Sequence, residues 1–109
     1  MLEFIQSRRF TSRLDNLAGP YADDVLSEIE NDLLKNPAAG VIVPGTGGLR
    51  KARAADPTRN KGKRGGFRYM YFYIAQEGRI FLLLLYDKDE QDDLTTAQKK
   101  WLRDNWGRL

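Results

Sequence analysis

The sequence predicts a single α+β domain, residues 1–109, in which a mostly antiparallel four-stranded sheet carries a helix hairpin on one face and a further helix at the end. Three observations predict this class. Two neighbouring segments near the start show helical spacing of apolar residues, the middle alternates like strands, and the last segment returns to helical spacing. The element order is therefore β-α-α-β-β-β-α. Five Phe, five Tyr and two Trp indicate a folded core.

The N-terminal half predicts a strand and two helices. Residues 2–6 alternate apolar and polar side chains, which is typical of a short strand. Ser7 is positioned to cap a helix that runs to about Leu17. Residues 19–20, Gly-Pro, interrupt it, and a second amphipathic helix follows as far as the Asn-Pro at 36–37. Because the interruption is short, we expect the two helices to form a hairpin.

The C-terminal half predicts three strands and a helix, separated by glycine-rich or polar connections. Its two most apolar strands are joined near Gly78, where a hairpin turn is expected. The segments, in order, are a glycine-rich connection 40–48, a strand 48–54, a polar loop 55–66, strands 67–75 and 79–86, an acidic segment 87–93 and a helix 94–106.

The composition removes several chemistries. The chain has no Cys, so it offers no disulfide and no thiolate metal site. It has no His, the usual general base and commonest metal ligand, so catalysis would depend on Lys, Arg, Tyr, Asp or Glu. We expect no cofactor and no metal. No signal peptide is apparent, and the longest apolar run, 80–86, is too short to cross a bilayer, so we expect a cytoplasmic protein with no membrane partner.

Positive charge is concentrated in the middle of the chain. Residues 48–79 contain nine of the 18 Lys and Arg but two of the 15 Asp and Glu, a local net charge of +7. The remaining residues therefore carry −4, although the whole chain is +3. A basic middle on an acidic frame favours a polyanionic partner that is recognised at one place. A basic surface that is simply solvated is the alternative.

Arg68 lies near the start of the strand 67–75, whose two faces are both largely apolar. An unpaired guanidinium on a central strand is costly. Arg68 therefore either pairs with a neighbouring carboxylate or grips a phosphate through two hydrogen bonds. Six other cations are expected to converge on it: Lys61, Lys63 and Arg64 from the loop, and Arg50, Lys51 and Arg53 from the neighbouring strand.

The aromatic residues allow two interpretations. Tyr69, Tyr71 and Tyr73 share one face of the strand 67–75 and are more often core residues than stacking platforms for bases. Tyr86 is the better candidate for stacking, because it ends a strand beside polar residues. The glycines around Lys61 and Lys63 match no nucleotide-binding fingerprint, since a strand rather than a helix follows them.

Three motifs resemble the RelE/HigB toxin superfamily, and the resemblance is closest to its HigB-like branch. They are Gly45-Thr-Gly-Gly-Leu-Arg-Lys51, Gly62-Lys-Arg-Gly-Gly-x-Arg68, and Leu85-Tyr-x-Lys-x-Glu90 followed by Asp93-Leu94. The resemblance implies a RelE-like fold and the toxin of a type II toxin–antitoxin module. Such toxins are ribosome-dependent mRNA endonucleases that act in the A site. Their antitoxins in the HigB-like branch usually carry a helix-turn-helix DNA-binding domain.

The resemblance also implies roles for individual residues. Lys61 and Lys63 match the loop lysines of the family, Arg68 its strand arginine, and Lys88 the basic residue after the last strand. The chain departs from RelE itself, in which a second arginine follows that basic position and a tyrosine lies further on, whereas this chain has Asp89 and Thr95 nearby. The implied reaction is attack of the 2′-hydroxyl on phosphorus, giving a 2′,3′-cyclic phosphate, with no metal.

With no histidine, catalysis would depend on positioning and charge stabilisation. Arg68, with Arg64, is expected to hold the developing phosphate charge. Lys61 or Lys63 is a candidate base if neighbouring cations disfavour its charged form. The candidate catalytic residues are Lys61, Lys63, Arg64, Arg68, Tyr86 and Lys88, and the candidate RNA- and ribosome-binding residues are Arg50, Lys51, Arg53 and Arg59. Two other functions stay open: a ParE-like toxin that acts on DNA gyrase, and a non-catalytic RNA-binding module.

Overall fold

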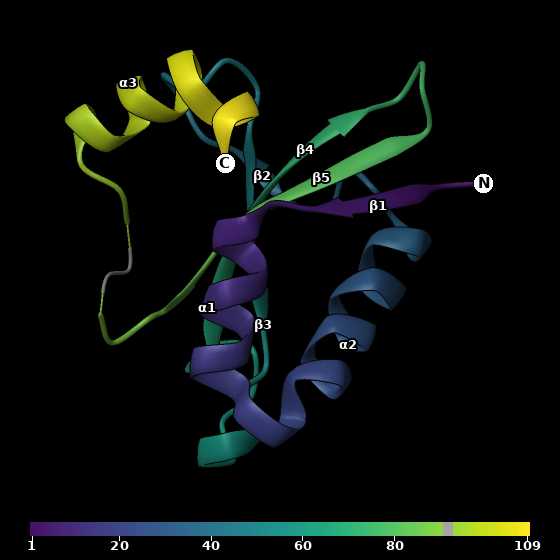
Figure 1. Cartoon of the computed structure of the whole chain (residues 1–109), viewed down its shortest axis with the longest axis vertical. Coiled ribbons are helices and arrows are strands. Elements are labelled where there is room, and N and C mark those ends of the chain that lie inside the picture. Colours follow the sequence, from purple (N-terminus) through teal and green to yellow (C-terminus); the bar gives the residue numbers. More distant parts are fainter. Residues whose placement is uncertain (91–92) are drawn as a thin grey trace.

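The computed structural model describes residues 1–90 and 93–109, and Figure 1 shows a mixed sheet with helices around it. The five strands are arranged in the order β1-β5-β4-β3-β2. Three 3-10 turns, Gly19–Tyr21, Pro57–Arg59 and Trp106–Arg108, accompany the main elements. These elements are β1 Glu3–Gln6, α1 Arg8–Ala18, α2 Ala22–Lys35, β2 Val41–Ile42, β3 Arg50–Ala54, β4 Phe67–Ile74, β5 Arg79–Asp87 and α3 Thr96–Asn105.

The predicted α+β class is confirmed and the seven predicted elements are present in the predicted order, but the predicted strand count of four is wrong because a fifth strand is inserted among them. The fifth strand, β2, lies inside the predicted glycine-rich connection and pairs antiparallel with Arg50 and Lys51 of β3. It has only two residues and both are exposed, so no apolar alternation marks it in the sequence. β1 pairs parallel with β5, and the other pairs are antiparallel. Residues 91–92 of the predicted acidic segment lie outside the described residues.

The predicted helix hairpin is present, and its start is set by Ser7. The Ser7 Oγ accepts a hydrogen bond from the Phe10 N–H at 2.9 Å and donates one to the Leu83 carbonyl at 2.7 Å. The cap therefore begins α1 and also attaches it to β5. Figure 1 shows α1 and α2 side by side. Their buried side chains form one core with the sheet: Phe10, Leu14, Ala18, Val25, Ile29 and Leu33.

β4 is the central strand, as its two apolar faces predict. Phe67, Tyr69 and Tyr71 are buried against the helix hairpin. On the opposite face Met70 is buried in a second core that includes Leu102 of α3. The helix hairpin therefore covers one face of the sheet, and α3 covers part of the other. The register between β4 and β5 shifts between Met70 and Tyr71, where the strand pair is irregular.

Tyr71 joins the sheet to the connection between α2 and β2. Its hydroxyl accepts a hydrogen bond from the Gly40 N–H at 2.8 Å and donates one to the Pro37 carbonyl at 2.8 Å. A Cβ on Gly40 would lie 2.8 Å from the Tyr71 ring, so the close approach requires glycine. Burial raises the pKa of Tyr71, although the Gly40 N–H and Arg50 act against it, so the phenol stays neutral.

In the part of the chain that the structure describes, no helix combines the length and apolar character needed to cross a membrane.

The first prediction concerns the two hydrogen bonds of the Tyr71 hydroxyl. We expect Tyr71→Phe to lower the free energy of unfolding by about 1–3 kcal/mol, because it leaves the buried Gly40 N–H and the part-buried Pro37 carbonyl without their partner. Urea denaturation measures the loss. Tyr73→Phe is the matched control, since the Tyr73 hydroxyl makes no hydrogen bond with a described residue, and we expect it to change stability by less than about 0.5 kcal/mol. Equal effects of the two substitutions would contradict the prediction.

Candidate functional site

The loop 55–66 between β3 and β4 has a fixed backbone. Asp56 and Lys61 form an antiparallel bridge in which the N–H of each donates to the carbonyl of the other, at 2.7 and 2.8 Å. The 3-10 turn between them ends at Asn60, whose φ of 53° lies in the left-handed region that asparagine tolerates. The loop cations therefore extend from defined backbone positions.

Gly66 packs this loop against the sheet. A Cβ there would lie 2.4 Å from the Ala54 carbonyl oxygen and 2.8 Å from the Asp56 nitrogen, which is too close for a side chain. The second glycine of the Gly-Gly pair is thus required by close backbone packing. The Gly66 carbonyl also accepts a hydrogen bond from the Lys88 N–H at 3.3 Å. This contact places Lys88, just after β5, beside the loop.

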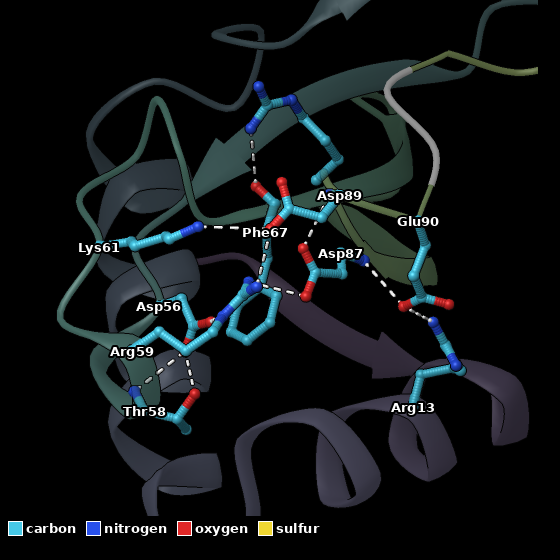
Figure 2. Close-up of polar contacts among 10 residues, drawn as sticks. Arg13, Asp56, Thr58, Arg59, Lys61, Phe67, Asp87, Asp89 and Glu90 are labelled. Atoms are coloured by element: carbon cyan, nitrogen blue, oxygen red, sulfur yellow. Dashed lines mark hydrogen bonds and ion pairs between the residues drawn. The ribbon is translucent and has the colours of Figure 1, made fainter.

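Asp56 is the buried polar centre of the loop, with only 1% of its surface exposed. Its carboxylate accepts hydrogen bonds from the Thr58 N–H at 2.9 Å and from the Arg59 Nε at 2.6 Å (Figure 2). Burial raises the pKa of Asp56, but the hydrogen bonds from Thr58 and Arg59 outweigh it, so the pKa lies below its ordinary value of 3.8. The buried carboxylate is therefore charged at neutral pH.

Arg59 connects the loop to the end of β5. Besides Asp56, its guanidinium contacts Asp87 at 2.7 Å and Asp89 at 2.9 Å. Figure 2 shows Arg59 between these three carboxylates. The hydrogen bonds to Asp56 and Asp87 raise the pKa of the guanidinium further. Arg59, which the sequence predicts to contact RNA, is thus paired with three carboxylates of the same chain, although its side chain is 34% exposed.

The two loop lysines also lie beside carboxylates. The Lys61 Nζ contacts the Asp89 carboxylate at 3.3 Å, and this hydrogen bond lowers the pKa of Asp89. The Lys63 Nζ contacts Asp32 of α2 and lies 4.0 Å from Glu28. The general-base role predicted for Lys61 or Lys63 depended on cationic neighbours, whereas the charged groups that contact both ammonium groups here are anionic.

Arg64 and Lys88 differ from these lysines. The Arg64 side chain is exposed and that of Lys88 is half-buried. Neither forms an ion pair with another described residue. The hydrogen bond between the Lys88 N–H and the Gly66 carbonyl places Lys88 beside Gly66, two residues from Arg64 in the loop. Their positive charges are therefore available to an anionic ligand.

Arg68 is buried, with 3% of its surface exposed. Its guanidinium donates to the carbonyls of Lys63 at 3.2 Å and Arg64 at 3.1 Å. It also donates to the Phe67 carbonyl at 3.3 Å. The planar guanidinium thus holds the returning end of the loop on the start of β4. These carbonyl contacts were not among the alternatives that the sequence suggested for Arg68.

A row of predicted residues crosses the sheet at Arg68. Arg53 of β3 and Tyr86 of β5 are its neighbours in register on either side. Arg53 is exposed, whereas 9% of Tyr86 is exposed. Because the ring of Tyr86 belongs to the core beneath α3, it offers little surface for stacking with a base.

The structure separates Arg50 from the other cations of β3. Arg50 lies opposite Tyr71, on the hairpin face, and its guanidinium donates to the Gly40 carbonyl at 2.8 Å. Lys51 and Arg53 point to the opposite face, since side chains alternate along a strand. Lys51 contacts Asp93 at 3.4 Å. The alternation of side chains along a strand predicts this separation. The expectation that all three cations converge on Arg68 is therefore wrong for Arg50.

The carboxylates that the sequence analysis did not assign to the site are its main organising groups. Two of these carboxylates lie on α2 and contact Lys63, and the others surround Arg59 and Lys61. The acidic segment after β5 signals part of this set by its closeness to a basic loop, but the α2 carboxylates carry no local signal. These residues are Glu28, Asp32, Asp56, Asp87 and Asp89. Across the described ranges, no group of three or more such side chains is arranged to hold a metal ion.

The second prediction concerns the buried charge of Asp56. We expect Asp56→Asn to lower the free energy of unfolding at pH 7 by about 1.5–3 kcal/mol, the usual strength of hydrogen bonds to a charged group. The pKa of Asp56 is lowered in the folded protein, so its contribution is present above its ordinary pKa of 3.8 and is lost as the pH falls below that value. The difference between wild type and Asp56→Asn should therefore shrink in acid.

Urea denaturation at neutral pH and at a pH below the folded pKa measures this difference. Asp15→Asn is the control, because Asp15 is exposed and forms no ion pair with a described residue. A constant difference across the pH range would contradict the assignment of the charged form to Asp56.

No protein-family model matches the chain. Two solved structures of the E. coli toxin RelE are similar to it, although their sequences are distant. One, a mutant in the free state, has a TM-score of 0.61 at 13% identity, covering 94% of this chain and 96% of that one. The other, the isolated toxin, has a TM-score of 0.56 at 12% identity, covering 95% and 98%. The expected RelE-like architecture is thus confirmed, and the chain has the fold of the RelE toxin.

Proposed function

We propose that this chain is the toxin of a type II toxin–antitoxin module and that it cleaves mRNA on the ribosome. One observation carries the proposal: in a RelE fold, the available cations Arg53, Arg64 and Lys88 gather around the row formed by Arg68 and Tyr86. This arrangement suits a phosphodiester that lies across the ends of β3, β4 and β5. The partners that we propose, from the resemblance to RelE/HigB toxins, are mRNA, the ribosomal A site and a cognate antitoxin with a helix-turn-helix domain.

The reaction that we propose is attack of the RNA 2′-hydroxyl on the adjacent phosphorus. The 5′-oxygen of the next nucleotide leaves, which gives a 2′,3′-cyclic phosphate and a 5′-hydroxyl. Negative charge grows on the phosphoryl oxygens in the transition state, and fixed cations lower its energy most when they need not reorganise. Arg64 and Lys88 are the residues that we assign to this charge, since both are outside the internal ion pairs.

Arg68 acts, in this proposal, as a positioning residue. Its hydrogen bonds to the Lys63 and Arg64 carbonyls fix the backbone from which the Arg64 side chain extends. Losing them would let Arg64 move away from the phosphate, and small displacements of a catalytic group cost large factors in rate. Arg68 therefore stabilises the developing negative charge in two ways: it positions Arg64, and it contributes its own positive charge.

Lys61 and Lys63 are proposed to bind the RNA backbone after exchanging their carboxylate partners for phosphates. In the free protein their ammonium groups contact Asp89 and Asp32. A general-base role for either lysine would require the same exchange before the proton transfer. Binding of mRNA in the A site, where phosphates are dense, supplies the competing anions.

The test of the proposed function is cleavage of a defined mRNA on purified translating ribosomes. We expect cuts in the A-site codon, with a 2′,3′-cyclic phosphate on one end and a 5′-hydroxyl on the other, and no cuts without ribosomes. A parallel supercoiling assay with DNA gyrase distinguishes the ParE-like alternative. Ribosome binding without any cleavage would overturn the enzymatic proposal in favour of a binding module.

The third prediction separates the roles of Arg64 and Arg68. Arg64→Ala should reduce kcat on ribosomes by about 10²–10³, as loss of a transition-state donor does, and leave the stability unchanged. Arg68→Ala should reduce both, because it leaves the buried Phe67 carbonyl and the part-buried Lys63 and Arg64 carbonyls without their donor, and a buried carbonyl without a partner costs about 1–3 kcal/mol of stability. Arg68→Lys keeps the charge but not the planar contacts, so we expect it to resemble Arg68→Ala. If Arg68→Ala had the same free energy of unfolding as the wild type, the proposed positioning role of Arg68 would be wrong.

The fourth prediction uses Arg50 and Arg53 as a matched pair on one strand. Arg53→Gln should weaken ribosome binding and reduce the slope of log K against log salt by about 0.7–0.9, the change for one lost phosphate contact. Arg50→Gln removes the same charge from the opposite face and should leave that slope unchanged. Filter binding of labelled ribosomes over a salt series measures both. Equal slopes for the two variants would mean that the β3 cations act only through net charge.

A further inference from the structure

A second cationic surface lies at the start of α1, away from the loop 55–66. It is a hollow of about 560 Å³, and its lining includes Arg8, Arg9, Arg13 and Arg108 together with Trp101 of α3. No acidic side chain lines it. Figure 1 shows the start of α1 beside the end of the chain, whereas the 3-10 turn of the loop 55–66 lies at the other end of α1. The Arg8 and Arg9 end of the hollow and this turn therefore lie at opposite ends of α1, and Arg13, midway along the helix, contacts Glu90 just after β5.

The surface is held in shape by the last helical turn. The Arg8 N–H donates to the Leu109 carbonyl oxygen at 3.2 Å, which brings Arg108 to the first turn of α1. Trp106 anchors this turn in the core, with its ring 4.8 Å from Phe72 and 5.4 Å from Phe81 between centroids. The arginines thus extend from a packed support rather than from a loose segment.

Three of the four arginines of this surface differ from most of the loop cations in having no carboxylate partner among the described residues. Arg8, Arg9 and Arg108 form no ion pair within residues 1–90 and 93–109. The fourth arginine, Arg13, is paired with Glu90 at 2.5 Å. Moreover, the first turn of α1 contains two arginines and no acid, although the helix dipole disfavours cations at that end. The fold alone therefore does not account for these charges.

Trp101 distinguishes this surface from a solvated basic patch. It is 49% exposed, and it lines the same hollow as the arginines. Stacking of a flat aromatic ring on an exposed indole is favourable, and unstacked nucleobases present such rings. Guanidinium groups suit the phosphates between those bases, because each can donate two hydrogen bonds in one plane.

We propose that this surface binds single-stranded nucleic acid, with phosphates on Arg8, Arg9 and Arg108 and one base on Trp101. A duplex would not offer a free base face to the indole. An acidic protein segment would satisfy the arginines but would not need the aromatic ring. The proposal goes beyond cleavage at the loop, and it holds for the intact chain whether or not that chain cuts RNA.

The experiment uses two labelled probes of about 12 nucleotides, 2′-O-methyl oligouridylate and oligothymidylate, with the full chain. The 2′-O-methyl group prevents cleavage, so binding is measured even if the proposed nuclease activity exists. Fluorescence anisotropy over a salt series gives affinity and salt slope. Photo-crosslinking followed by mass spectrometry of the peptides locates the contact. The two probes distinguish RNA-like from DNA-like ligands.

Arg8→Gln/Arg9→Gln should weaken binding at least tenfold and reduce the salt slope by about 1.4, the value for two contacts to a single strand. Lys35→Gln/Arg79→Gln removes the same charge elsewhere on the surface and should have a much smaller effect. Trp101→Ala should weaken binding roughly 5- to 150-fold, the range for loss of one stacked base, with the salt slope unchanged. The wild-type crosslink should map to the peptide that contains Trp101.

Removing arginines from the first turn of α1 relieves a dipole conflict, so the double variant should stay folded, which circular dichroism checks. Equal losses of affinity in the two double variants would mean that binding depends only on the net charge of the protein, and would overturn the proposal. Unchanged binding by Trp101→Ala, or crosslinks confined to the loop 55–66, would overturn it as well. Displacement of the probe from the wild type by polyglutamate, with no dependence on Trp101, would instead indicate an acidic protein partner.

Discussion

The contact between Asp56 and Arg59 is the constraint on which the basic loop depends. Five cations lie within residues 59–68, and their mutual repulsion opposes any fixed arrangement. Asp56, buried under the loop, removes part of that repulsion and holds Arg59 where Asp87 and Asp89 can reach it. The loop is thereby attached to the end of β5. Arg68 holds the other end of the loop through its hydrogen bonds to the Lys63 and Arg64 carbonyls. The first half of the loop is therefore positioned by the attachment to β5, and its returning half by the hydrogen bonds from Arg68.

Most of the fold could be predicted from the sequence, because its signals are local. The Ser7 cap, the helical spacing of Val25, Ile29 and Leu33, and the two apolar faces of β4 each depend on residues close together in the chain. The two-residue strand β2 has no such signal. It exists because β3 offers it a partner and Tyr71 holds the preceding connection.

The candidate site was predicted less completely, because its arrangement depends on contacts between distant segments. The pairing of Lys63 with Asp32 and the burial of Arg68 under carbonyls of the loop both require the tertiary structure. The separation of Arg50 from Arg53 was available from the alternation of a strand. The meeting of Arg8 with Arg108 could not be foreseen, since it needs the last turn to pack on the first helix.

The parallel pairing of β1 with β5 has a consequence for the order in which the chain acquires its structure. Glu3 and Arg79 are register partners that lie 76 positions apart. At roughly 5–20 residues per second, a ribosome needs several seconds to make the chain between them. During that interval β1 has no partner strand, and the Ser7 cap lacks its Leu83 carbonyl acceptor. Both β1 and α1 contact β5 across most of the sequence, so closure of this sheet edge must be a late event in biosynthesis.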